Sequence, residues 1–148
     1  MTFFSGPGIM PGLNNDLGMQ TDLLSTFITL AGFTESYPSP DSFDLSDSLQ
    51  KRTPSPRNFV PFYKGSELRA FRLRDHKIQY VTQGAYGAPP ERQVHESPLL
   101  IDLINDVGES TNLADKNTAL VTQIDNIARE FEVSIEVKPS ILDSQDRH

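Results

Sequence analysis

The second half of the chain alternates short β-type runs and then ends in one amphipathic helix. Residues 59–63, 68–73 and 78–82 are rich in aromatic and β-branched side chains, which favours strands. Residues 118–131 repeat apolar side chains at helical spacing. A helix of that length is not stable alone in water, so its stripe needs a sheet face to cover. The stripe consists of Leu120, Ile124, Ile127, Ala128 and Phe131, and Asn117 is the expected N-cap.

Turn signals and prolines predict how the strands are joined. The polar residues 74–77 are short enough to connect the second and third runs as an antiparallel hairpin. Pro61 has no backbone N–H to donate, so the first run is expected at a sheet edge. Leu99–Leu103 predicts a fourth strand that ends in a turn at residues 105–108, and Val133–Val137 predicts a short final strand. We predict an α+β fold, in which a small antiparallel sheet of about four strands packs against the C-terminal helix.

The first part of the chain predicts a loop and one more helix. Glycines and prolines over residues 6–18 favour a loop, and Thr21 or Asp22 suits a helix N-cap. Gly32 suits a left-handed C-terminal cap. The helix is expected to bury one apolar face, made of Leu23, Leu24, Phe27, Ile28 and Ala31.

That helix has no obvious partner in the chain, because residues 34–57 are rich in Ser, Pro and Asp and predict a linker without regular elements. We therefore divide the chain into a loop–helix segment at 1–33, a linker at 34–57, a sheet subdomain at 58–139 and a tail at 140–148.

Composition excludes several classes of function. The chain has 20 acidic and 13 basic residues, and its formal net charge of −7 disfavours binding to nucleic acid or anionic membrane surfaces. The absence of cysteine excludes disulfides, thiolate metal sites and a cysteine nucleophile. The N-terminus lacks a basic signal-peptide region, so as written the chain is expected to stay in the cytoplasm.

Several residue runs follow one another in a fixed order along the chain. They are Gly6–Gly12 with Asp22–Phe27 and Leu30–Gly32; Phe43–Leu45; and Phe71–Lys77 with Tyr80, Thr82 and Gln83, followed by His95–Leu103 and Asn105–Leu113. In this order the runs resemble the last third of arylsulfatase-type sulfatases. The chain departs from the family pattern at Ser25 and Val107, where proline is common, and at Ser42 and Ile101, where glycine and tyrosine are usual.

The resemblance implies a C-terminal fragment of a sulfuric ester hydrolase. The opening segment would be a remnant of the alkaline-phosphatase-like α/β sulfatase fold, and its helix would pack on the missing catalytic domain or mediate self-association. The complete enzyme would use a calcium ion and a formylglycine nucleophile, and full-length relatives are often exported or lysosomal. The fragment would lack the nucleophile and metal site and be inactive alone. The alternative is a free-standing, non-catalytic interaction module that reuses the sulfatase C-terminal sheet.

His95 is the one residue that the resemblance places at the rim of a substrate pocket. It could instead be a loop residue at a strand entry, and a lone imidazole needs a substrate site opposite it to act as a base. The other histidines have simpler interpretations, since His76 falls in a hairpin turn and His148 is terminal. No catalytic or metal-binding residue is predicted in this chain.

Three further groups have a structural and a functional interpretation, and we favour the structural one for each. The run Thr53–Arg57 resembles the family's nucleophile motif only in composition and is expected to be an exposed hinge. The second group is Asp41, Asp44 and Asp47, which could form a cation site or a solvated acidic loop. Asp102 and Asp106 are expected to accept hydrogen bonds from backbone N–H groups of a turn. The third group is Arg69, Arg72, Arg74 and Lys77, which could bind a sulfate group or form ion pairs on the surface with Glu67 and Asp75.

Overall fold

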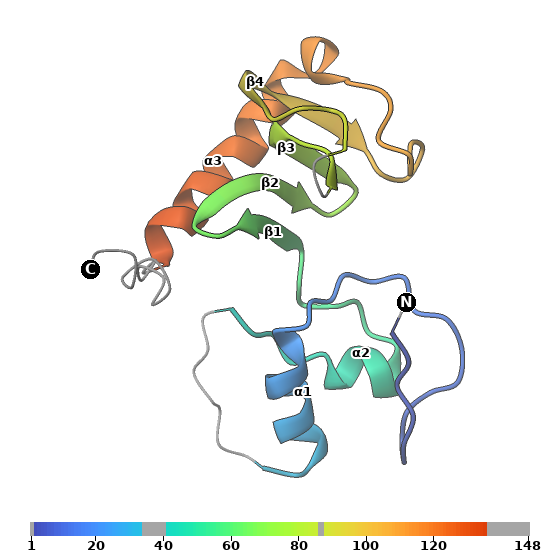
Figure 1. Cartoon of the computed structure of the whole chain (residues 1–148). Coiled ribbons are helices and arrows are strands. Elements are labelled where there is room, and N and C mark those ends of the chain that lie inside the picture. The colour runs from blue at the N-terminus through green and yellow to red at the C-terminus, as the bar shows by residue number, and fades with distance from the viewer. Residues whose placement is uncertain (1, 34–40, 86–87, 136–148) are drawn as a thin grey trace, which may run out of the picture. The chain divides into compact units, whose positions relative to one another are not determined.

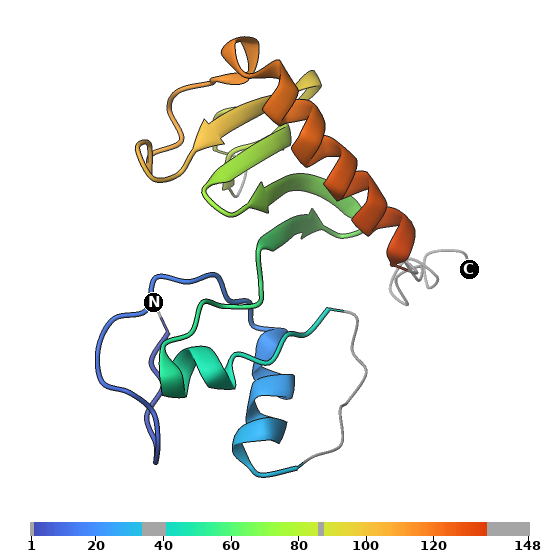
Figure 2. The same ribbon diagram turned by 180° about the vertical axis from the view of Figure 1, so that it is seen from behind.

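A computed structural model describes residues 2–33, 41–85 and 88–135, and the chain divides into two compact units, Met1–Asn58 and Phe59–His148. The second unit is an antiparallel sheet in the order β1-β2-β3-β4, with α3 lying across one face (Figure 1, and from behind in Figure 2). The predicted α+β fold is confirmed. The elements are α1 (Asp22–Leu30), α2 (Ser46–Lys51), β1 (Phe59–Lys64), β2 (Glu67–Leu73), β3 (His76–Thr82), β4 (Gln93–Asp102), the 3-10 turn η2 (Ala114–Lys116) and α3 (Thr118–Ser134).

The predicted hairpin between the second and third strands is confirmed. Phe71 pairs with Ile78, and Leu73 pairs with His76, so the turn is only Arg74 and Asp75. The turn is shorter than predicted because His76 and Lys77 pair with β2 instead of remaining in the loop. Arg74 has φ of 50°, in the left-handed region that a tight connection between antiparallel strands requires.

The two outer strands show where a sequence pattern does and does not set strand limits. β1 lies at a sheet edge, as Pro61 predicts. β4 begins at Gln93, six residues before the predicted start at Leu99. Pro98 and the Gly/Pro-rich stretch before it favour a late start of the strand. The pairing of β4 with β3 nevertheless continues past them, through a register irregularity between Gln79 and Val81 of β3.

The core of the second unit lies between α3 and the sheet. Ile124 and Ala128 of the predicted stripe are fully buried, and three aromatic rings, Phe59, Phe71 and Phe131, pack with centroids 5.2–6.1 Å apart. The predicted last strand is wrong for its first residues, because α3 continues through Val133 and Ser134 after the packed Phe131. Residues 136 and 137 lie outside the described residues. The buried cluster is Phe71, Ile78, Leu100, Ala114, Val121, Ile124 and Ala128.

A polar contact fixes the position of α3 on the sheet. The Tyr80 hydroxyl donates to Asp125 Oδ1 at 2.9 Å, and Arg129 Nε donates to the other oxygen of the same carboxylate at 2.8 Å. Burial, followed by the hydrogen bond to Asp125, raises the pKa of the Tyr80 phenol well above its usual range. No helix within the described ranges is long and apolar enough to cross a membrane.

The first unit is built around a buried ion pair between Asp22 and Arg57. Arg57 donates from Nε and from a terminal guanidinium nitrogen to the two carboxylate oxygens of Asp22, at 2.6 and 2.5 Å. The same carboxylate accepts the backbone N–H groups of Met19 and Phe43, at 2.7 and 2.8 Å. Asp22 therefore does not act as the predicted N-cap, and neither Thr21 nor Asp22 caps the helix by a side-chain bond. Instead, Asp22 joins three separate segments of the unit.

Residues 41–57 are not the featureless linker that their composition predicts. They include α2, and Leu45 N–H donates to Thr26 Oγ1 of α1 at 3.0 Å. Arg57 is buried, and its guanidinium stacks 4.5 Å from the centre of the Phe43 ring. The prediction of an exposed hinge is therefore wrong at Arg57, because the side chain is needed to pair with Asp22.

The face of α1 that is buried is the opposite of the one predicted. Asp22 and Thr26 are the buried residues, whereas Leu24 and Phe27 are 50% and 53% exposed. The predicted cap at Gly32 agrees with its φ of 82° and with the bond from its N–H to Thr29 O. The apolar stripe thus has the expected spacing, but the described residues of this unit leave Leu24 and Phe27 exposed and Leu23 and Ile28 half-buried.

Replacing Asp22 with Ala should strongly destabilise the first unit. The change leaves the Arg57 guanidinium buried without its carboxylate, which costs about 3–5 kcal/mol. Hydrogen exchange at the Met19 and Phe43 amides measures this loss locally. The control is Asp47→Ala, which breaks the exposed pair with Lys51 and should cost about 0.3–0.5 kcal/mol. Equal losses in the two variants would contradict the role of the buried pair.

Candidate functional site

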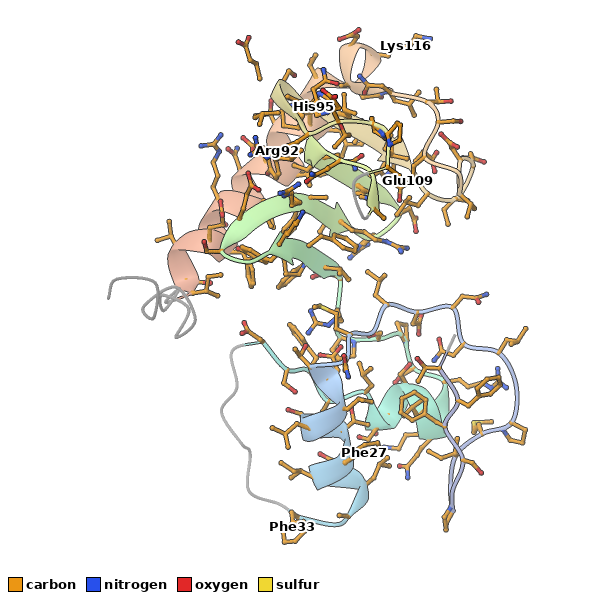
Figure 3. The ribbon with its side chains drawn as sticks, in the orientation of Figure 1. Phe27, Phe33, Arg92, His95, Glu109 and Lys116 are labelled. Atoms are coloured by element: carbon orange, nitrogen blue, oxygen red, sulfur yellow. The ribbon has the colours of Figure 1, made fainter. Side chains whose placement is uncertain are left out.

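His95 lies in β4 and is half-buried. Its Nε2 is 3.0 Å from Oγ1 of Thr82, the last residue of β3. Strand alternation places Thr82 on the same face as Ile78, the face covered by α3. The contact occupies Nε2, so Nδ1 is the ring nitrogen available to another partner. Figure 3 labels His95 with Arg92, which directly precedes the same strand.

A row of polar side chains crosses the same end of the sheet. Lys64 Nζ and an Arg69 guanidinium nitrogen both donate to Gln83 Oε1, at 3.2 and 3.0 Å. Glu67 forms an ion pair with Arg69, whose Nε lies 2.7 Å from one carboxylate oxygen, and its other oxygen accepts a hydrogen bond from Arg92 at 2.5 Å. The hydrogen bond from Arg92, together with the charge of Arg69, lowers the pKa of the Glu67 carboxyl. These five residues, Lys64, Glu67, Arg69, Gln83 and Arg92, are termed the cation row.

The four cations predicted to gather on the β2–β3 hairpin do not form one cluster. Arg69 belongs to the cation row, and its predicted pairing with Glu67 is confirmed. Arg72 Nε donates a hydrogen bond to the backbone oxygen of Arg74 at the other end of β2. Lys77 pairs with Glu109 at 2.5 Å instead of with Asp75, and it lies 5.3 Å from the centre of the Phe62 ring. The strand separates these groups because Arg69 and Arg74 lie near its opposite ends.

Sequence reasoning missed Lys64, Gln83 and Arg92 as members of the cation row that includes Arg69. No local motif marks them, because they come from three different parts of the chain. Their position follows only from the topology: in an antiparallel meander, the β1–β2 and β3–β4 connections lie at the same end of the sheet. Arg92 also precedes the predicted start of β4, so its proximity to the sheet was not expected.

The motif-like run at residues 53–57 holds no candidate nucleophile. Thr53 and Pro54 are exposed, and Arg57 is committed to Asp22. The Ser55 hydroxyl donates to the backbone oxygen of Leu17 at 2.7 Å, which ties the segment to the N-terminal loop. The structural interpretation of this run is therefore favoured, although the segment is anchored and not a free hinge.

The acidic residues have local roles. Asp44 accepts the Ser46 N–H, and Asp47 pairs with Lys51. Asp102 and Asp106 accept turn backbone N–H groups, as predicted. The Asn105 side-chain amide and then the turn N–H groups lower the pKa of the Asp102 carboxyl, and the N–H groups of Ser110 and Thr111 lower the pKa of the Asp106 carboxyl. Within residues 2–33, 41–85 and 88–135, no group of three or more His, Cys, Asp or Glu side chains could hold a metal ion.

The remaining histidines do not join His95. His76 is the first residue of β3 and is half-buried, where it pairs with Leu73 and Asp102 in the ladder, so it lies in a strand and not in the predicted turn. His148 lies outside the described residues. One sequence-predicted site residue, His95, thus lies at the same end of the sheet as a cation row that the sequence did not predict.

Comparison with known proteins identifies the family. Residues 55–148 match the model for the C-terminal region of aryl-sulfatase. Arylsulfatase A of Homo sapiens is 37% identical over 123 residues, covering 72% of this chain and 24% of the relative. Arylsulfatase A of Bos taurus is 32% identical over 157 residues, covering 90% of this chain and 31% of the relative. The chain therefore spans about a quarter to a third of the length of these relatives.

Solved structures show the same fold. A sulfatase from Pseudoalteromonas sp. superposes with a TM-score of 0.62 and 19% identity, covering 74% of this chain and 24% of that one. A Bacteroides thetaiotaomicron structure from work on glycosaminoglycan metabolism gives a TM-score of 0.61 at 19% identity, covering 76% of this chain and 24% of that one. The chain belongs to the aryl-sulfatase family, corresponds to its C-terminal region and does not contain the catalytic domain.

Proposed function

We propose that this chain is the non-catalytic supporting part of a sulfuric ester hydrolase and that it docks through α1 on a sulfatase catalytic domain. The observation that carries the proposal is the orientation of α1. Leu24 and Phe27 face solvent, while the charged Asp22 is fully buried. An apolar helix face gains about 25 cal/mol for each Å² removed from water, so a partner that covers it stabilises the chain.

Phe33 extends this apolar surface beyond the end of α1. It is 69% exposed and, as Figure 3 shows, lies beyond the same helix as Phe27. Large exposed apolar side chains grouped on one element indicate an interaction surface more than isolated ones do. A catalytic domain of a sulfatase fits this surface because the family relatives contain several times the length of this chain.

His95 would serve the reaction from the rim of the substrate pocket. With Nε2 held by Thr82, Nδ1 is the nitrogen that can meet a sulfate oxygen. An Nδ1–H would donate a hydrogen bond to that oxygen, while Nε2 accepts from the Thr82 hydroxyl. The role is to bind and orient the ester, since no described residue near His95 is a candidate nucleophile.

The groups that break the ester bond would come from the catalytic domain. The family resemblance implies a calcium ion and a formylglycine nucleophile, which would polarise and attack the sulfate group. The described acidic residues of this chain do not fit a calcium site, because Asp44 and Asp47 are committed to a turn and to an ion pair. Residues of this chain would therefore take no part in breaking the ester bond.

The purified chain should not hydrolyse an aryl sulfate, with or without added calcium. The reason is that it holds neither a nucleophile nor a metal site among its described residues. Release of the phenol from a chromogenic aryl sulfate measures the activity. Turnover that persists through repeated purification, and that is lost in His95→Ala, would overturn the proposal.

The apolar face of α1 should control self-association of the isolated chain. Phe27→Asp is expected to shift the chain from associated species to monomer in size-exclusion chromatography with light scattering, because it places a charge in the apolar surface. The matched control is Val107→Asp, which alters a side chain that is 82% exposed in the second unit. A wild-type chain that is already monomeric, or that forms one defined complex with another protein, would favour the free-standing interaction module instead.

Thr82 should determine the state of the His95 ring. Thr82→Val removes the hydroxyl at nearly constant volume, so the ring nitrogens are expected to populate both neutral tautomers. Thr82→Ser keeps the hydroxyl and should preserve the wild-type state. The ring ¹⁵N chemical shifts measure the tautomers, with His76 as an internal reference. Identical His95 shifts in all three proteins would show that the 3.0 Å contact does not orient the ring.

A further inference from the structure

His95 lies in an interruption of the pairing between β3 and β4. The ladder pairs on either side of Tyr80 are separated by one residue in β3 but by four in β4, so residues 95–98 lie opposite Tyr80 alone. Extra residues of this kind have no regular ladder partner, and their side chains are turned in new directions. The ladder therefore does not fix the His95 ring, and the contact with Thr82 Oγ1 becomes more important for its orientation. The flanking pairs are Gln79 with Leu99 and Val81 with Val94.

The end of β3 is also weakly tied to β2. The ladder between these two strands runs from His76 to Gln79 of β3, so Thr82 lies three positions beyond the last pair. On the other side, Thr82 pairs with Gln93 of β4. A strand end that is paired on one side only opens more readily than the strand centre, and its opening would move the Thr82 hydroxyl away from the imidazole.

Gln83, the residue after Thr82, ties this strand end to the rest of the sheet. Its Oε1 accepts a hydrogen bond from Lys64 Nζ at 3.2 Å and one from an Arg69 guanidinium nitrogen at 3.0 Å. Lys64 is the last residue of β1 and Arg69 belongs to β2, so the two bonds connect the end of β3 to both strands of the first hairpin. Hydrogen bonds from charged donors are stronger than those between neutral groups.

Arg69 is itself the extra residue of a bulge in β2. Two neighbouring residues of β1 pair with Ala70 and Leu68 of β2, so Arg69 has no partner in that ladder. Leu68 and Phe71 both pack against the core, although they are three positions apart and side chains on one face of a regular strand are two apart. The bulge thus takes Arg69 out of the alternation of the strand, and its guanidinium bonds Gln83.

We propose that Gln83 is a positioning residue for the ring of His95. The two bonds to Gln83 fix the end of β3 and so keep the Thr82 hydroxyl within hydrogen-bond distance of Nε2. With Nε2 accepting from that hydroxyl, the proton of the neutral ring stays on Nδ1. The inference rests on the pocket-rim role proposed for His95, and it adds a residue that acts through Thr82 instead of through the substrate.

The test follows the neutral His95 ring of the full chain by its ¹⁵N chemical shifts. Gln83→Met removes the acceptor at similar size and should lower the ratio of the Nδ1–H tautomer to the Nε2–H tautomer about two- to tenfold, the range for one lost hydrogen bond. Gln83→Glu keeps an acceptor oxygen for the two cations and should preserve the wild-type ratio. The matched control is Gln123→Met, an exposed residue of α3, which should leave the ratio unchanged.

A double-mutant cycle with Thr82→Val separates positioning from a general loss of stability. If Gln83 acts through Thr82, Gln83→Met should cause no further change once the hydroxyl is absent. An unchanged ratio in Gln83→Met, an equal change in Gln83→Glu, or an equal further change in the Thr82→Val background would overturn the proposal.

The amide spectrum of each variant checks that the fold is kept. Where Gln83→Met does not fold, Lys64→Met takes its place, since it removes one of the two donors and leaves the bond from Arg69. A smaller change of the tautomer ratio is expected there, and an unchanged ratio would again overturn the proposal. Because the readout is the state of one ring, its failure would leave the turnover and docking tests of the proposed function unaffected. Turnover by the isolated chain, conversely, would leave the positioning of the ring unaffected.

Discussion

The packing of α3 against one face of the sheet holds the second unit together. Ile124 and Ala128 are fully buried against Phe71, Ile78 and Leu100. This apolar contact is not directional by itself, and the hydrogen bond from Tyr80 to Asp125 adds a fixed point between helix and strand. A shift of register by one residue would turn the buried side chains of a strand to the other face, so burial under α3 also fixes the pairing of the strands.

Fixed pairing has consequences at the strand ends, where polar residues lie. A meander of four antiparallel strands places two of its three connections at one end of the sheet. Thr82 then meets His95, and Gln83 meets Lys64 and Arg69, although these residues are far apart in sequence. The candidate site and the cation row are thus a result of topology and register. Neither depends on a local motif.

This difference explains what the sequence could and could not predict. The presence of the four strands, the edge position of Pro61 and the start of α3 follow from periodicity and backbone chemistry, which are local; the end of α3 and the start of β4 do not. The short helix α2 was missed because its six residues carry a single apolar side chain, Leu49, and therefore no stripe. The pair of Asp22 and Arg57 spans 35 positions, and nothing near either residue indicates the other. Long-range polar contacts of this kind need the fold before they can be recognised.

The buried pair of Asp22 and Arg57 also explains why α1 turns its polar side toward the interior of the unit. Burying two charges is costly, and the unit offsets this cost by giving the carboxylate two backbone N–H groups in addition to the guanidinium. A chain selected only for its own stability would bury Leu24 and Phe27 and leave the charges in water. Here the polar side of α1 organises the unit from within, and Leu24 and Phe27 on the apolar side stay exposed among the described residues. The same helix thus joins the loop segments of this chain and presents the surface on which a larger sulfatase domain would pack.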